Sequence, residues 1–96
     1  MSTIVRLYVA VTLNGDSELL AISGECNCLF IHPKIQRAEV IGVADIQGVA
    51  CIEVNVTFLR VLDKDQIESV IESLNWEIVH ESIDKAQLLP EFKILS

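Results

Sequence analysis

Hydrophobic and polar residues alternate with a period of two at the start of the chain. In residues 3–13, Val5 and Leu7 fall on one face, while Arg6 and Tyr8 fall on the other. Successive side chains of a strand point to opposite faces and β-branched residues favour strands, so this segment predicts a long strand. Residues 18–31 and 49–62 alternate in a similar way, and residues 38–46 alternate less cleanly; all three segments predict further strands.

Turn-forming residues separate these segments. The run Asn14–Gly15–Asp16–Ser17 predicts a hairpin turn, because asparagine and glycine tolerate positive φ. Proline lacks the N–H that a strand needs, so His32–Pro33 predicts the end of the second strand. Gln47–Gly48 predicts another tight turn. Short links join antiparallel neighbours, so the four strands are expected to form a meander.

The period changes to that of a helix after residue 62. Asp63 and Gln66 are spaced as a capping box, and apolar residues then recur at i, i+3, i+4 and i+7 from Ile67. This pattern predicts an amphipathic helix over residues 64–74. Asn75 is expected to end it in the left-handed conformation.

Together these elements predict an α+β fold: a curved antiparallel β-meander of four long strands, one amphipathic helix, and a return strand over residues 76–83. A helical turn over residues 84–89 and a short edge strand over residues 91–95 are expected to follow, with Pro90 between them. No linker divides the chain, so residues 1–96 are expected to form a single domain. No internal repeat is evident in the residues.

The predicted strands present more apolar area than the predicted helix can cover. A helix over residues 64–74 is roughly 16 Å long, whereas a strand of ~11 residues reaches about 36 Å. Gly24, Gly42 and Gly48 would allow the sheet to curve onto itself. The uncovered part of the face can also pack against a second copy, and the mismatch therefore favours a curved sheet that also forms a homo-oligomer.

Composition and charge narrow the functional classes. The 96 residues are 51 % hydrophobic with 4 Gly and 2 Pro, which excludes a disordered or low-complexity chain. The net charge is −7, and most of it falls in residues 63–96. Because phosphate binding needs a basic face, this charge disfavours nucleic acid and an anionic membrane surface as partners. It suits a protein partner with a basic surface, and it also keeps an apolar protein in solution.

The N-terminal residues and the cysteines indicate the cellular compartment of the protein. The N-terminus has no basic region followed by an apolar run, so a secretory signal is not expected. Three cysteines make a poor disulfide framework. They predict free thiols and a cytoplasmic location, where the environment is reducing.

Cys26, Cys28 and His32 form the most tempting chemical cluster, because thiolate and imidazole groups bind zinc or copper. On a strand, however, both cysteines share a face with Phe30, and no second pair of ligands accompanies them. We therefore expect the cysteines to pack in the core, with no metal site. Cys51 lies on the more polar face of its strand, either exposed or beneath the helix.

Motifs of catalysis and cofactor binding are absent from the residues. The chain has no nucleophile elbow, phosphate-binding loop or dinucleotide fingerprint, so no cofactor and no catalytic residue are expected. Glu68 and Glu72 lie four residues apart on the predicted helix, where a solvated face explains both. Trp76 is expected to fill the corner between helix and sheet.

One polar constellation extends over several strands. The candidate ligand-binding residues lie on the less apolar faces of the first, second and fourth predicted strands: Arg6, Tyr8, Glu25, Asn27, Glu53 and Asn55. An ordinary solvated face of an antiparallel sheet explains the same pattern.

By elimination, the sequence favours a small, acidic, non-catalytic protein that binds another protein or assembles with itself, as regulators and inhibitors do. The alternative is a small-molecule binding module with a pocket between the curved sheet and the helix. An enzyme that uses the polar sheet face is the third interpretation.

Overall fold

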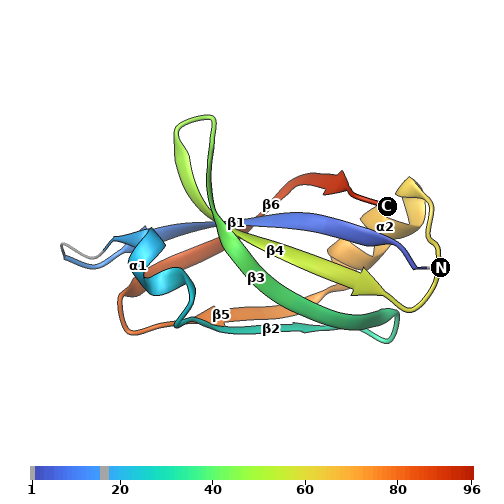
Figure 1. Cartoon of the computed structure of the whole chain (residues 1–96), viewed down its shortest axis with the longest axis horizontal. Coiled ribbons are helices and arrows are strands. Elements are labelled where there is room, and N and C mark those ends of the chain that lie inside the picture. Colours follow the sequence, from blue (N-terminus) through green and yellow to red (C-terminus); the bar gives the residue numbers. More distant parts are fainter. Residues whose placement is uncertain (1, 16–17) are drawn as a thin grey trace.

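Six strands and two helices form from the residues that the computed structural model describes, which are 2–15 and 18–96 (Figure 1). Neither of these described helices is long and apolar enough to cross a membrane. In chain order the elements are β1 (Ile4–Leu13), α1 (Leu19–Ser23), β2 (Asn27–Ile31), β3 (Ile35–Ile46), β4 (Val49–Phe58), α2 (Lys64–Ser73), β5 (Asn75–Val79) and β6 (Ile83–Ile94).

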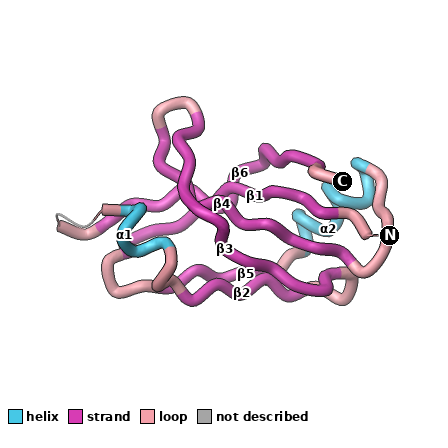
Figure 2. Tube along the Cα trace, viewed as in Figure 1, coloured by secondary structure: helices cyan, strands magenta, loops and turns pink. Residues whose placement is uncertain are grey.

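The strands divide between two antiparallel sheets. One has four strands in the order β3-β4-β1-β6 and is called the large sheet below. The other contains β2 and β5 alone and is called the ribbon. The two strands of the ribbon run side by side along the large sheet in Figures 1 and 2. The predicted α+β class with antiparallel sheets is therefore confirmed, although the strand order is not that of a single meander.

The core lies between one face of the large sheet and the elements that cover it. Alternate residues of a strand point to the same side, so one face of the central strands β1 and β4 supplies most of the buried side chains. The buried core residues are Val5, Leu7, Val9, Ile52, Val54, Val56 and Phe58 from the large sheet, Phe30 and Ile78 from the ribbon, Leu62 before α2, and Ile67 and Val70 from α2.

The sequence predicted an apolar sheet face too large for one helix to cover. In the structure other parts of the same chain cover this face. Val9 and Ile52, at the centre of that face, are 0 % exposed. The ribbon provides the missing cover, because residues 27–31 leave the large sheet and pair with β5 instead. This face therefore lacks the uncovered apolar area that led us to expect a homo-oligomer.

Residues 18–31, expected to be one strand, form α1 and β2 instead. A strand would have buried Leu20 beside Ile22. In the structure Ile22 is 7 % exposed and Leu20 is 71 % exposed. The helical spacing of Leu19 and Ile22 turns both away from solvent, since Leu19 packs against the core and Ile22 is buried, which the alternating pattern did not reveal.

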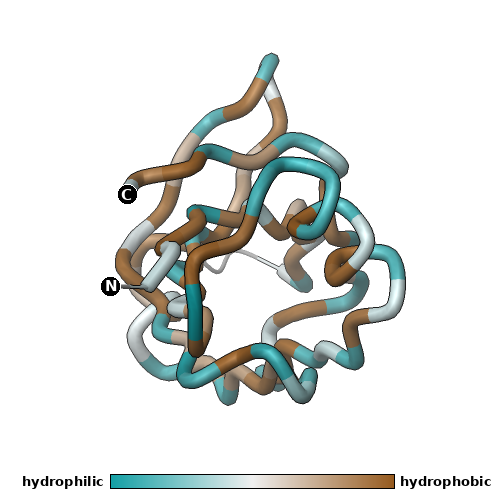
Figure 3. The backbone as a smooth tube through the Cα atoms, turned by 90° about the vertical axis from the view of Figure 1, so that its right-hand side faces the viewer, coloured by the Kyte–Doolittle hydropathy of each residue, from teal (hydrophilic) through white to brown (hydrophobic). Residues whose placement is uncertain are grey.

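The predicted hairpin turn at Gln47–Gly48 is confirmed, whereas the hairpin expected between the first two strands was wrong, because β1 leads to α1 and pairs with β4 and β6. Gln47 and Gly48 connect β3 to β4 with positive φ values of 54° and 83°, and Asp45 Oδ1 accepts a hydrogen bond of 2.7 Å from the Gly48 N–H. Figure 3 shows this hairpin projecting from the body with a hydrophilic tip. Gly15 also has positive φ, whereas Asp16 and Ser17 of that predicted turn lie outside the described residues.

The predicted capping box of α2 is confirmed. Asp63 Oδ1 accepts a hydrogen bond of 2.8 Å from the Gln66 N–H, and Gln66 Oε1 accepts one of 2.9 Å from the Asp63 N–H. The other end differs, because α2 ends at Ser73 and Leu74 is extended. Asn75 begins β5, so the prediction of a left-handed cap there was wrong.

Residues 84–89 form no helical turn but belong to the long edge strand β6. β6 pairs with β1 on both sides of a register shift, which lies between Leu88 and Phe92. Pro90 falls within this shift. A proline is tolerated at a bulge of an edge strand, where its missing N–H breaks no ladder.

The chain contains an internal repeat, so the expectation of no repeat was wrong. The order strand–helix–strand–strand occurs twice, as β1-α1-β2-β3 and as β4-α2-β5-β6. Equivalent strands have equal lengths: 10 residues in β1 and β4, 5 in β2 and β5, and 12 in β3 and β6. Because β1 pairs antiparallel with β4 and β2 with β5, an approximate two-fold axis through both pairs relates the halves.

The register and the residues support this two-fold relation. β3 shifts its register against β4 after Ile35 and Val40, and β6 shifts against β1 at Ile83 and Leu88, which are 48 residues further on (83 − 35 and 88 − 40). Between residues 27–46 and 75–94, five residue pairs at this spacing are identical: Asn27 and Asn75, His32 and His80, Ile35 and Ile83, Ala38 and Ala86, and Ile46 and Ile94.

Thr3 joins the start of the chain to the link between β4 and α2. It is 2 % exposed, and its Oγ1 accepts a hydrogen bond of 2.9 Å from the Leu62 N–H. We expect Thr3→Val to lower the free energy of unfolding by about 1–3 kcal/mol, because the buried N–H loses its acceptor at unchanged volume. Urea denaturation measures this change. The matched control, Thr12→Val on the exposed side of β1, should change it far less, and equal losses would contradict the argument.

The two-fold relation predicts that the halves can exchange their order in the chain. The Ile4 N–H donates to the Ser96 carbonyl at 3.3 Å, so the ends lie side by side. A permuted chain that begins at residue 48, crosses from residue 96 to residue 2 through a short glycine–serine linker, and ends at residue 47 should keep the circular dichroism spectrum and unfold cooperatively. A permutant opened inside β1, between Leu7 and Tyr8, should not fold. A permutant opened at residue 47 that fails to fold would contradict the repeat.

Candidate functional site

The six predicted ligand-binding residues fall on two different parts of the molecule. Arg6, Tyr8, Glu53 and Asn55 lie together on the outer face of the central strands, where Arg6 pairs with Asn55 and Tyr8 with Glu53. Arg6 Nε donates to Asn55 Oδ1 at 3.1 Å, and Arg6 Nη1 lies 3.7 Å from Glu53 Oε2. Tyr8 is 5 % exposed. Arg6 thus contacts two polar residues of β4, and these cross-strand contacts stabilise the register of β1 against β4.

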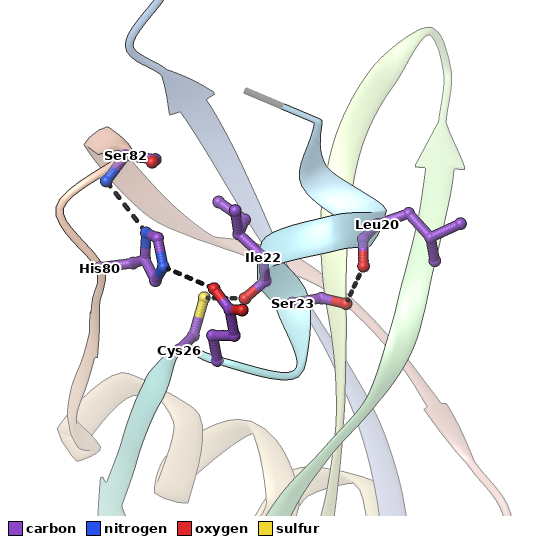
Figure 4. Close-up of polar contacts among 7 residues, drawn as sticks. Leu20, Ile22, Ser23, Cys26, His80 and Ser82 are labelled. Carbon is purple, nitrogen blue, oxygen red and sulfur yellow. Dashed lines mark hydrogen bonds and ion pairs between the residues drawn. The ribbon is translucent and has the colours of Figure 1, made fainter. Parts of the chain in front are cut away.

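Glu25 and Asn27 lie elsewhere, at one end of the ribbon. Asn27 is the first residue of β2, and Glu25 precedes it in the link from α1. His80 Nε2 lies 3.3 Å from Glu25 Oε2, and His80 Nδ1 accepts a hydrogen bond of 3.0 Å from the Ser82 N–H (Figure 4). In the neutral ring this arrangement places the proton on Nε2, which donates to Glu25.

His32 makes the same contacts in the other half of the repeat. Its Nδ1 accepts a hydrogen bond of 3.1 Å from the Lys34 N–H, and its Nε2 lies 3.3 Å from Ser73 Oγ. Each histidine therefore fastens the turn of one half to the helix end of the other. A general base needs a free ring nitrogen near a reacting group. Both Nδ1 atoms already accept from the backbone, so the histidines act as positioning residues for the two turns.

The three thiols are held in their neutral form. Cys26 Sγ donates to the Ile22 carbonyl at 3.2 Å (Figure 4). Burial, with a smaller contribution from the neighbouring Cys26, raises the pKa of Cys28 from 9.0 to about 11. Burial also raises the pKa of Cys26 and of Cys51. Thiolates are the nucleophilic and metal-binding form, so this environment favours packing over chemistry.

Cys26 and Cys28 pack against the core as the sequence predicted, and Cys51 is buried with 0 % exposure. Within the described part of the chain, no three histidine, cysteine or carboxylate side chains gather as metal ligands would. Trp76 stacks on Phe30 with the ring centres 6.3 Å apart, on the inner face of the ribbon.

The outer face of the ribbon carries exposed apolar side chains. Leu29 is 49 % exposed, Ile31 is 52 % exposed and Val79 is 47 % exposed. Cross-strand pairing places them on one face beside three polar residues, since Asn27 pairs with Val79, Leu29 with Glu77 and Ile31 with Asn75. We call these six residues the ribbon face. Three large apolar side chains gathered on one exposed face are typical of a surface that contacts another molecule.

Sequence reasoning missed this face although its signal was present. Leu29 and Ile31 are apolar at positions that alternate with Asn27, on the side expected to be polar. A solvated face explains one such residue, but two in succession predict an apolar patch on this face. The expectation of a long strand over residues 18–31 concealed the signal, because it assigned this face to the large sheet.

A hollow of about 490 Å³ opens on the ribbon face. It is lined by Asn27, Cys28, Leu29, Glu77 and Val79, which belong to two neighbouring cross-strand pairs and the residue between them. Aliphatic groups and polar oxygens therefore meet in one place. The Glu77 carboxylate has no ion-pair partner among residues 2–15 and 18–96.

Two further hollows adjoin each other between α2 and β6. They measure about 430 and 240 Å³ and share three lining residues, Glu68, Pro90 and Phe92. Lys64 Nζ lies 4.0 Å from Glu68 Oε1 at their rim, so part of the acidic charge there is already paired. The location, between helix and sheet, is the one that the sequence predicted for a small-molecule pocket, but none of the six predicted ligand-binding residues lines it.

No family model, curated protein or solved structure matches this chain, so the function of these surfaces has to be argued from their own residues.

The thiol environment predicts slow alkylation of Cys28. Because its pKa rises from 9.0 to about 11, the thiolate fraction at pH 8 falls roughly a hundredfold. We expect iodoacetamide to modify Cys28 about a hundredfold more slowly in the native protein than in urea, and the native rate to climb about tenfold per pH unit from pH 8 to 10. Mass spectrometry of the peptides follows each cysteine. Equal native and unfolded rates would show a reactive thiol and contradict the assignment.

Proposed function

We propose that this protein is a small, non-catalytic binding module that docks another polypeptide on the ribbon face. The observation that carries the proposal is the exposure of Leu29, Ile31 and Val79, each near half, on one contiguous face. The opposite face of the ribbon is packed on the core, so the exposed face has a rigid support. Contact with a partner would remove the three side chains from water and gain the corresponding hydrophobic free energy.

The charge pattern favours a different polypeptide over a second copy of this one. Glu77 is paired with Leu29 at the centre of the ribbon, close to the approximate two-fold axis. Two copies stacked through their ribbon faces would bring two Glu77 carboxylates together while water was excluded, which is costly without a counter-charge. Each copy also carries a net charge of −7. A partner with a basic surface removes both penalties.

A small-molecule binding function is the second candidate. The adjoining hollows between α2 and β6 favour it, because helix and sheet both line them and Phe92 supplies an aromatic surface. A ligand there would have to tolerate Glu68 and Glu72. The exposed apolar side chains of the ribbon face lie outside these hollows and would stay uncovered by such a ligand.

Site-specific photo-crosslinking tests the docking function. p-Benzoylphenylalanine in place of Leu29 should give a discrete covalent adduct with another polypeptide in the cells that produce the protein. The same probe in place of Glu39, which pairs with Asn55 in the large sheet, is the matched control and should give none. The adduct should disappear when Ile31→Ser and Val79→Ser are added.

The identity of the adduct decides between the interpretations. A heterologous adduct from position 29 that depends on Ile31 and Val79 supports docking of another polypeptide. An adduct of this chain with itself, matched by a dimer mass in light scattering, would replace the proposal with self-assembly. Equal adducts from positions 29 and 39, or none from position 29, would contradict a docking role for the ribbon face.

A further inference from the structure

We infer that the hollow on the ribbon face receives a lysine or arginine side chain of the docked polypeptide, with Glu77 as the residue that selects it. This inference rests on the proposed docking function and names the chemistry of the contact. The hollow joins two aliphatic side chains, Leu29 and Val79, to two side chains with acceptor oxygens, Glu77 and Asn27. Lysine and arginine side chains complement this lining, because each has an aliphatic methylene stem that ends in a cationic group.

An apolar side chain would fit the hollow less well than a cationic one. It would cover Leu29 and Val79, but it would also separate the Glu77 carboxylate from water without providing a donor. A buried acceptor that loses its hydrogen bonds destabilises the complex. An ammonium or guanidinium group provides donors to Glu77 and to the Asn27 side-chain oxygen, so both parts of the hollow are satisfied together.

The internal repeat shows that Glu77 is a departure from symmetry. Under the two-fold relation, Asn27 corresponds to Asn75 and Ile31 to Val79, so these positions keep their character in both halves. The remaining pair differs in kind, because Leu29 corresponds to Glu77. A ribbon face that served only to bury apolar area would be served by an aliphatic residue at both positions. The Glu77 carboxylate therefore makes the ribbon face chemically asymmetric.

The charges at the two ends of the ribbon also favour a basic side chain over the hollow. Glu81 follows Val79 by two residues, at the end of the ribbon where the hollow lies, and Glu25 precedes Asn27 by two. Glu25 is paired with His80, whereas Lys34 follows Ile31 at the opposite end. A bound segment should accordingly place its basic side chain over the Asn27–Val79 end and an uncharged apolar side chain over Ile31.

Nuclear magnetic resonance titration with defined peptides tests the inference. The probes are capped pentapeptides that alternate valine and threonine and carry lysine, arginine, norleucine or glutamate at the centre. Norleucine keeps the stem of lysine without its charge. We expect the lysine and arginine peptides to shift the backbone amide signals of Asn27, Leu29, Glu77 and Val79, and to bind up to about fivefold more tightly than the norleucine peptide. The glutamate peptide should bind most weakly.

Two variants isolate the role of Glu77. Glu77→Gln should remove the preference for lysine over norleucine. Glu77→Leu, which restores the symmetry of the face, should reverse that preference by strengthening the norleucine complex. Glu39→Gln changes the net charge by the same amount on the outer face of the large sheet and is the matched control. It should leave the preference unchanged, and an equal loss there would assign the effect to overall charge and overturn the inference.

The remaining outcomes separate this inference from the docking function. Lysine and norleucine peptides that bind the ribbon equally would overturn the cation site while leaving docking intact. Free spermidine that produces the same amide shifts at the same concentration as the lysine peptide would overturn the assignment to a polypeptide and point to a small-molecule amine site. A specific photo-adduct from position 29, with no amide shift from any peptide, would likewise refute the cation site alone.

Discussion

The pairing of β1 with β4 is the constraint on which the rest of the structure depends. These are the two central strands of the large sheet, and together they carry most of the fully buried side chains. Because they run antiparallel and are equivalent in the repeat, their pairing also defines the approximate two-fold axis. Every other element occurs once on each side of that axis. Hydrophobic burial and symmetry are therefore properties of the same pair of strands.

The same pairing determines which surfaces remain free. The inner face of β1 and β4 requires a cover, and the ribbon provides it with Phe30, Trp76 and Ile78. Since side chains of a strand alternate, a ribbon that covers the core on one side must present its other side outward. Leu29, Ile31 and Val79 are exposed for this reason. The surface proposed for docking is thus the outer side of a structural element whose inner side is packed on the core.

The repeat also explains the roles of the polar side chains that were candidates for a catalytic or ligand-binding site. His32 and His80 occupy equivalent turns, and each contacts the helix end of the opposite half. The two histidines therefore have matching structural roles. The polar set on the outer face of the large sheet is likewise built across the symmetric strand pair, with Arg6 in contact with Asn55 and Glu53. What the symmetry does not account for is Glu77, and that is where a partner of defined chemistry is proposed.

Local patterns in the sequence determined the α+β class, the capping box at Asp63, the turn at Gln47–Gly48 and the core face of β1, because each depends on residues close together in the chain. The sequence also contained the repeat, in the matching residues 27–46 and 75–94, but at a spacing that only the aligned strands made visible. Tertiary structure alone decided that residues 18–31 divide into a helix and a strand. Helical and extended forms both bury apolar side chains from this segment, and the choice depends on the distant strand β5 that β2 pairs with. The ribbon face follows from that choice, since an exposed surface is defined by what the remainder of the chain leaves uncovered.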